Sequence, residues 1–129
     1  MEPILIPVAP GELLDKITIL RIKVLRIEDL GKRANAVAEL TMLEEVQAKD
    51  VLASDQLTSL EIDLSVVNEA LWEIEDAVRD HERVQDFGPA FVKLARDVYR
   101  QNDRRAALKR QINTLLGSVI VEEKSYAGY

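Results

Sequence analysis

The feature that most constrains the fold is a row of apolar residues that recurs every three or four positions between residues 57 and 78. Its members are Leu57, Leu60, Leu64, Val67, Leu71, Ile74 and Val78. This spacing places all of them on one side of a helix, which we expect to run from Ser54 or Asp55 to about Asp86. A second row beside the first places polar groups and the only tryptophan at the margin of the packed side: Asn68, Trp72, Glu75 and Arg79.

Three further segments have helical periodicity. The segment from about 11 to 29 is apolar around much of its circumference, which predicts a central helix with neighbours on several sides. In the segment from about 32 to 53, the expected inward residues are Val37, Leu40, Leu43 and Val46. The segment from about 89 to 116 has an apolar row that is interrupted by Asn102 and Arg105, where apolar residues are expected.

Glycine, proline and serine separate these segments. Gly31 and Gly117 are expected to end helices, Ser54 or Asp55 to cap one, and Phe87-Gly88-Pro89 to form a turn. Because the linkers are short, consecutive helices are expected to be antiparallel. The sequence therefore predicts a single all-α domain over residues 1–129, an antiparallel bundle of two helical hairpins with coiled-coil-like seams. Residues 4–8 and 118–121 are expected to be short extended segments, and we predict that they pair as strands.

Composition limits the classes of function. The chain has 129 residues, a net charge of −6 and no cysteine. An acidic chain is a poor default partner for nucleic acid or for an anionic membrane surface, since both require a basic face. The sequence has no apolar run long enough for a membrane span and no basic region before its first apolar residues. We therefore expect a cytoplasmic protein that binds neither nucleic acid nor membrane and needs no metal or other cofactor.

A polar zone is expected in the middle of the second hairpin. That hairpin turns near residue 88, so residue i of one helix is expected roughly opposite residue 175 − i of the other. The zone would hold Asn68, Trp72, Glu75, Asp76, Arg79, Tyr99, Asn102, Asp103 and Arg105, and Asp15, Lys16 and Lys23 of the central helix are expected to join it. Buried polar groups must pair, bind a ligand or reach water. The zone is therefore either a closed network that fixes the hairpin register or a ligand site.

One pattern bears on catalysis. Glu44-Glu45 and Glu73-x-x-Asp76 resemble the paired acids with which all-α nucleoside triphosphate pyrophosphohydrolases hold Mg²⁺. Acid pairs at this spacing are common in acidic helical chains, so this hypothesis ranks last. No cysteine is present and no serine lies in a nucleophile elbow, which favours a non-enzymatic protein.

The chain as a whole is similar to a family of small bacterial proteins of unassigned function. The similarity lies in PGELLDKITIL from Pro10, NEALWEIED from Asn68, YRQNDRR from Tyr99, and Gly117-Ser118 followed by VEEKSY from Val121. The serine usual before the Pro-Gly-Glu is Ala9 here, which removes a capping box with Glu12. The resemblance implies a bacterial or phage origin and a loose association with sugar-nucleotide or envelope biology. It implies no catalytic residues.

These observations predict a non-enzymatic binding or assembly module that forms a homodimer. The third helix offers roughly 45 Å of apolar seam and the central helix covers roughly 29 Å of it, so apolar surface at one end is left for a partner. Two alternatives remain. One is a protein that binds an anionic small molecule such as a nucleotide or nucleotide-sugar, with Arg79, Arg105, Lys16 and Lys23 at phosphate and Trp72 or Tyr99 stacking. The other is the Mg²⁺-dependent pyrophosphohydrolase.

Overall fold

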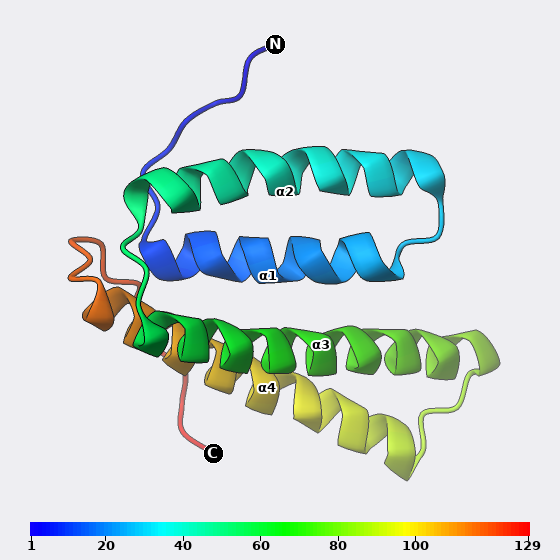
Figure 1. Ribbon diagram of the computed structural model, residues 1–129. Coiled ribbons are helices and arrows are strands. Elements are labelled where there is room, and N and C mark those ends of the chain that lie inside the picture. The colour runs from blue at the N-terminus through cyan, green and yellow to red at the C-terminus, as the bar shows by residue number, and fades with distance from the viewer.

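The computed structural model describes residues 1–129 and contains four helices and no strand. They are α1 (Pro10–Arg26), α2 (Leu30–Asp50), α3 (Asp55–Val84) and α4 (Pro89–Leu115). The helices α1 and α2 form one antiparallel hairpin, and α3 and α4 form the other (Figure 1). The expected all-α bundle of two hairpins is confirmed. No helix has a stretch that is both long and apolar enough to cross a membrane.

The ends of the helices follow local capping chemistry. Pro10 and Pro89 each begin a helix, and the Ser54 hydroxyl accepts a hydrogen bond from the Leu57 backbone N–H at 3.1 Å. Gly117 follows α4 with φ of +65°, which glycine adopts without strain. The expectation for Gly31 was wrong: Asp29 caps α2 by accepting from the Lys32 N–H at 2.9 Å, so Gly31 lies inside the first turn of α2.

The central helix of the bundle is α1. It packs against each of the other three helices, whereas α2 reaches α3 only through side chains such as Gln47, which donates to Glu61 at 2.9 Å. The buried core joins α1, α3 and the end of α4 and consists of Leu13, Leu14, Ile17, Leu57, Leu64 and Ile112. From α2, Leu40 and Leu43 pack against this core as expected, whereas Val37 and Val46 are exposed because α2 contacts the bundle along one narrow side.

The two terminal segments do not pair. Figure 1 shows the N-terminus leaving the bundle beside α2 and the C-terminus on the side of α4. Pro3 and Pro7 lack the backbone N–H that a strand ladder needs. The Ser118 hydroxyl contacts the Ile120 carbonyl at 2.7 Å and the Ile120 N–H at 3.2 Å, which folds this segment into a turn. The predicted short strands are therefore absent.

Candidate functional site

A buried polar network joins α1, α3 and α4 at the middle of the bundle. Its centre is Asp15, whose residue surface is 1% exposed. One oxygen of the Asp15 carboxylate accepts from Asn68 Nδ2 and from Arg105 Nε, each at 2.9 Å, and the other accepts from Arg105 Nη2. Thr18 Oγ1 donates to the Asp15 carbonyl at 2.8 Å and accepts from Asn68 Nδ2 at 2.9 Å. The hydrogen bonds to Asp15 raise the pKa of Arg105.

The network satisfies the buried groups that it contains. A buried carboxylate without partners would be strongly disfavoured, but Asp15 accepts three hydrogen bonds and faces one guanidinium. We call the four side chains Asp15, Thr18, Asn68 and Arg105 the buried tetrad. Of the two alternatives for the polar zone, these four residues form the closed network and not a ligand site.

Two further contacts between α1 and α4 follow the tetrad at one-turn intervals. Lys109 Nζ donates to Glu12 at 2.6 Å, and the Asn113 side-chain oxygen accepts from the Gly11 N–H at 2.7 Å. The backbone of Gly11 approaches α4 so closely that a Cβ there would lie 2.6 Å from the Lys109 carbonyl oxygen. The positions 105, 109 and 113 share one side of α4, so this row of polar residues sets the register of α4 on α1.

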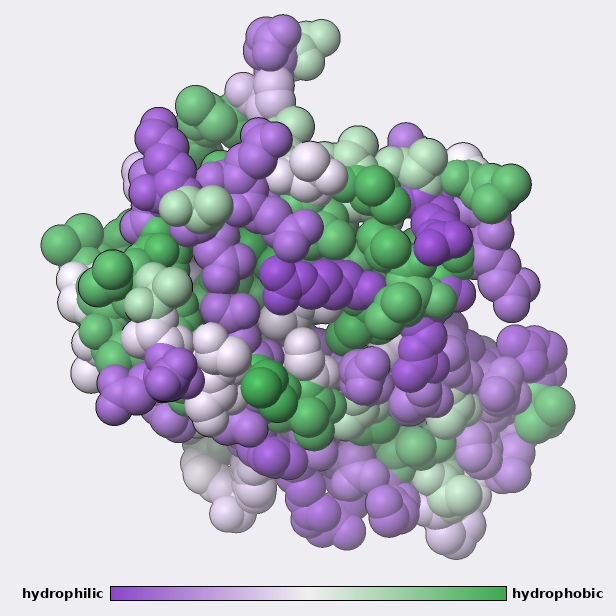
Figure 2. All heavy atoms as spheres, viewed as in Figure 1, coloured by the Kyte–Doolittle hydropathy of each residue, from purple (hydrophilic) through white to green (hydrophobic).

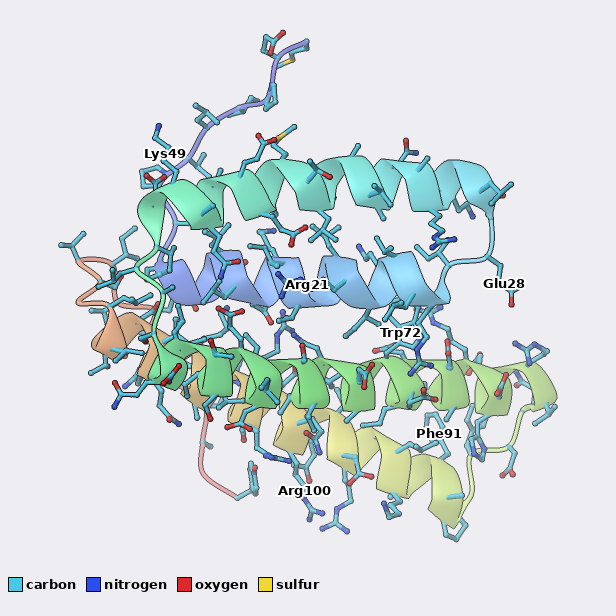
Figure 3. All side chains as sticks on the ribbon, viewed as in Figure 1. Arg21, Glu28, Lys49, Trp72, Phe91 and Arg100 are labelled. Atoms are coloured by element: carbon cyan, nitrogen blue, oxygen red, sulfur yellow. The ribbon has the colours of Figure 1, made fainter.

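Beside the tetrad lies an open groove of about 550 Å³ between α1, α3 and α4. The expected site residues that line it are Asn68, Trp72, Glu75, Asp76 and Arg79 of α3 with Asn102 and Arg105 of α4. Three apolar side chains complete the lining: Ile19, Leu71 and Val98. Figure 3 shows Trp72 in the space between α3 and the C-terminal half of α1. We call this hollow the Trp72 groove, and its size is typical of small-molecule sites.

The Trp72 groove is lined by charges of both signs. They are the two carboxylates Glu75 and Asp76 and the two guanidiniums Arg79 and Arg105. Arg105 is committed to Asp15, and Arg79 lies 3.7 Å from Glu75 with a side chain that is 75% exposed. Amides, charges of both signs and one aromatic ring can hydrogen-bond and stack with a ligand.

Tyr99 and Asp103 lie outside the Trp72 groove. They line a second hollow of about 1110 Å³ between α4 and the segment that follows it, which also reaches Asn102 and Arg105. Residues 98, 102 and 105 share one side of α4, whereas residues 99 and 103 lie about 100° around the helix. The structure thus divides the expected polar zone between two sides of α4.

Lys16 and Lys23 lie one turn before and one turn after Ile19 on α1, and neither lines the groove. Lys16 is exposed and lies 3.9 Å from Glu12, and Lys23 is half-buried with no ion pair. Both are close enough in sequence to Ile19 to border the groove on its α1 side.

The acids of the pyrophosphohydrolase hypothesis do not converge. Glu44 on α2 pairs with Arg21 at 3.1 Å, and Glu73 on α3 pairs with Arg26. The helices α2 and α3 meet through Gln47, which donates to Glu61 at 2.9 Å, and no three acidic, histidine or cysteine side chains are grouped as metal ligands. Glu44 and Glu73 form surface ion pairs with α1, whereas Glu45 and Asp76 have no ion pair.

The sequence predicted that Asp15 joins the polar zone but not that it is the centre of the network, and Thr18 was not among the predicted site residues. Asp15 and Thr18 stand three residues apart within an otherwise apolar stretch of α1, so they share a side of the helix. An acid at such a position indicates a buried partner elsewhere in the chain. The matching signal for this partner was Arg105, which interrupts the apolar row of α4.

Comparison of the chain with protein-family models, with curated protein sequences and with solved structures returned no match.

Proposed function

We propose that this protein is a non-enzymatic binding module and that its ligand occupies the Trp72 groove. The observation that carries the proposal is the position of Trp72, a large half-buried aromatic side chain in an open groove beside a satisfied polar network. Trp72 is only partly covered although its ring is among the most favourable side chains to bury. The tetrad supplies a rigid floor, because each of its members is fixed by partners from other helices.

Tryptophan fluorescence tests the groove directly, since Trp72 is the only tryptophan. A panel of small metabolites, including nucleotides, nucleotide-sugars and neutral saccharides, is titrated while the emission maximum and the thermal midpoint are recorded. Binding in the groove is expected to shift the emission and to raise the midpoint through linkage.

The matched variants for this experiment are Asn102→Ala, which lines the groove, and Asn35→Ala, which lies on the exposed part of α2. We expect the first to weaken binding and the second to leave it unchanged. Equal affinities of both variants for a ligand that shifts the fluorescence would show that the groove is not the site.

A second candidate is an anionic ligand such as a nucleotide or nucleotide-sugar. It is favoured by Lys23, which is half-buried without an ion pair, and by the exposed guanidinium of Arg79. The acids Glu75 and Asp76 oppose it. Glu75→Gln would raise the affinity for a phosphate-bearing ligand and leave that for a neutral one unchanged, so this variant distinguishes the two ligand classes.

We also propose that the module is a homodimer. Two areas of exposed apolar side chains support this: Met42 and Val46 on α2, and Val84, Phe87 and Val92 at the α3–α4 turn. Figure 2 shows hydrophobic side chains exposed over α1 and α2 and at the left end of the visible face, with hydrophilic side chains among them. The second area lies at the turn of the α3–α4 hairpin. There α3, which has 30 residues, extends beyond the end of α1, which has 17.

Light scattering across a wide concentration range tests the dimer. Met42→Gln/Val46→Gln and Val84→Gln/Val92→Gln each change one area, and Ile62→Gln/Val66→Gln is a control pair of similar exposure on α3. The pair that yields monomers identifies the interface. A native protein that stays monomeric at the highest concentration would refute the dimer.

A further inference from the structure

The hollow of about 1110 Å³ beside α4 lies between this helix and residues 118–129, which we call the C-terminal segment. This segment folds back along α4 and is held there mainly by charged contacts. Lys109 Nζ lies 3.1 Å from Glu122, Arg110 Nη2 lies 3.5 Å from Glu123, and Lys124 Nζ lies 3.0 Å from Asp103. Three successive residues of the segment therefore each have a partner of opposite charge on α4.

Three cations of α4 line the hollow beneath the segment, Arg105, Lys109 and Arg110, together with one acid, Asp103. They belong to a basic stretch of an acidic protein: residues 93–110 contain seven lysines and arginines and two acids, and the whole chain has a net charge of −6. Lys109 is the least exposed cation there, with 14% of its side chain accessible, and it contacts Glu12 and Glu122 together. Burial lowers the pKa of Lys109, but the hydrogen bonds to these two carboxylates outweigh burial and raise it.

An aromatic contact fixes the far end of the segment. The Tyr129 ring packs edge-on against Tyr99 with centroids 5.1 Å apart. Hydrogen bonds from Tyr129 and Lys124 lower the pKa of Asp103. The α4 surface therefore contacts two adjacent carboxylates and an aromatic ring six residues later.

We propose that this side of α4 is a binding surface for acidic peptide segments of a partner protein, and that the C-terminal segment occupies it in cis. Charge complementarity selects the partner, because the groups that α4 presents at residues 109 and 110 are an ammonium and a guanidinium that meet carboxylates. The surface does not involve the Trp72 side chain, so this proposal stands without the proposed function.

The cis contact is weak enough to be displaced. Exposed ion pairs each contribute about 0–1 kcal/mol and are screened by salt. Gly117, with φ of +65°, ends α4, and the Ser118 N–H donates to the Asn113 carbonyl at 2.9 Å, so the segment leaves the helix directly after this turn. A segment on so short a linker has an effective concentration on the order of millimolar, which a partner in trans must overcome.

The experiment uses the full chain labelled with ¹⁵N and an unlabelled peptide of the sequence of residues 118–129. The variant Glu122→Gln/Glu123→Gln weakens the cis contact, and Glu2→Gln/Glu28→Gln removes the same charge from positions outside it. We expect the peptide to shift amide resonances of residues 99–110. Its Kd for the segment variant should be at least about tenfold lower than for the native or control chain, and binding should be lost in about 1 M salt.

Three results would overturn the proposal. A peptide carrying glutamine at both acidic positions would bind as well as the native peptide if charge did not select the partner. Resonances of the C-terminal segment at random-coil positions in the native chain at low salt would show that the segment does not occupy α4. Stronger shifts of residues 99–110 by a single-stranded oligonucleotide of equal charge would assign the surface to nucleic acid instead of acidic peptides.

Discussion

Breaking the buried ion pair between Asp15 and Arg105 is expected to destabilise the protein strongly. Removing one partner of a buried pair typically costs about 3–5 kcal/mol, because the remaining charge stays buried without compensation. Arg105→Met leaves the carboxylate of Asp15, 1% exposed, with only the Asn68 amide, and we expect a loss of about 3–4 kcal/mol. Asp15→Asn leaves the guanidinium of Arg105, whose side chain is 31% exposed and can reach water, so we expect about 2–3 kcal/mol.

The double variant Asp15→Asn/Arg105→Met decides between a coupled pair and two independent residues. With both charges removed, the neutral amide of residue 15 still faces Asn68 and Thr18, so no buried charge remains. We expect the double variant to be no less stable than Arg105→Met. Its loss of stability would then be smaller than the sum of the two single losses by at least about 2 kcal/mol, which is the coupling energy of the pair. Arg21→Met is the control, because the Arg21 side chain is 42% exposed: its pair with the exposed Glu44 contributes about 0–1 kcal/mol, and its second partner Glu61 lies 3.9 Å away.

Urea unfolding followed by Trp72 fluorescence measures these differences. With a slope of about 2 kcal/mol per M, a loss of about 3 kcal/mol lowers the midpoint by about 1.5 M. Additive effects of the two single changes, within about 0.5 kcal/mol, would refute the coupled tetrad. An Asp15→Asn variant that is as stable as Arg21→Met would also refute the coupled tetrad.

Three other predictions follow from single contacts. Gly11→Ala places a Cβ 2.6 Å from the Lys109 carbonyl and 2.8 Å from the Asn113 side chain, so we expect thermal unfolding to show a loss of about 1–3 kcal/mol. Glu44→Gln should change stability by less than about 0.5 kcal/mol in the same assay, since its ion pair is exposed. Hydrogen bonds from Tyr129 and Lys124 lower the pKa of Asp103 below 3.8. The contact of the ionised Asp103 with the C-terminal segment therefore stabilises the protein fully above pH 3.8. This stabilisation is lost as the pH falls through the lowered pKa. NMR titration of the Tyr129 amide would show this loss, and a titration step between about pH 5 and 7 would contradict it.

The helices themselves were predictable because their signals are local. The apolar row from Leu57 to Val78 and the turn at Gly88-Pro89 located α3 and the second hairpin, and Ser54 caps α3 as expected. The strand prediction failed because β-pairing depends on a partner that the sequence does not specify. Val37 and Val46 were misplaced because periodicity finds an apolar side of α2 but not how much of it α1 covers.

For the site, helical spacing alone was enough to place Asn68, Trp72, Glu75 and Arg79 on a shared side of α3. The sequence also marked Arg105 as a polar break in an apolar row. That Arg105 meets Asp15 could be known only from the packing of the helices, because the contact spans 90 residues and depends on how α4 lies across α1. The same packing placed Tyr99 and Asp103 in the neighbouring hollow, which shares Asn102 and Arg105 with the Trp72 groove. Spacing within one helix determines neighbours along it, whereas the angle between helices, set by contacts such as the one at Gly11, decides which sides meet.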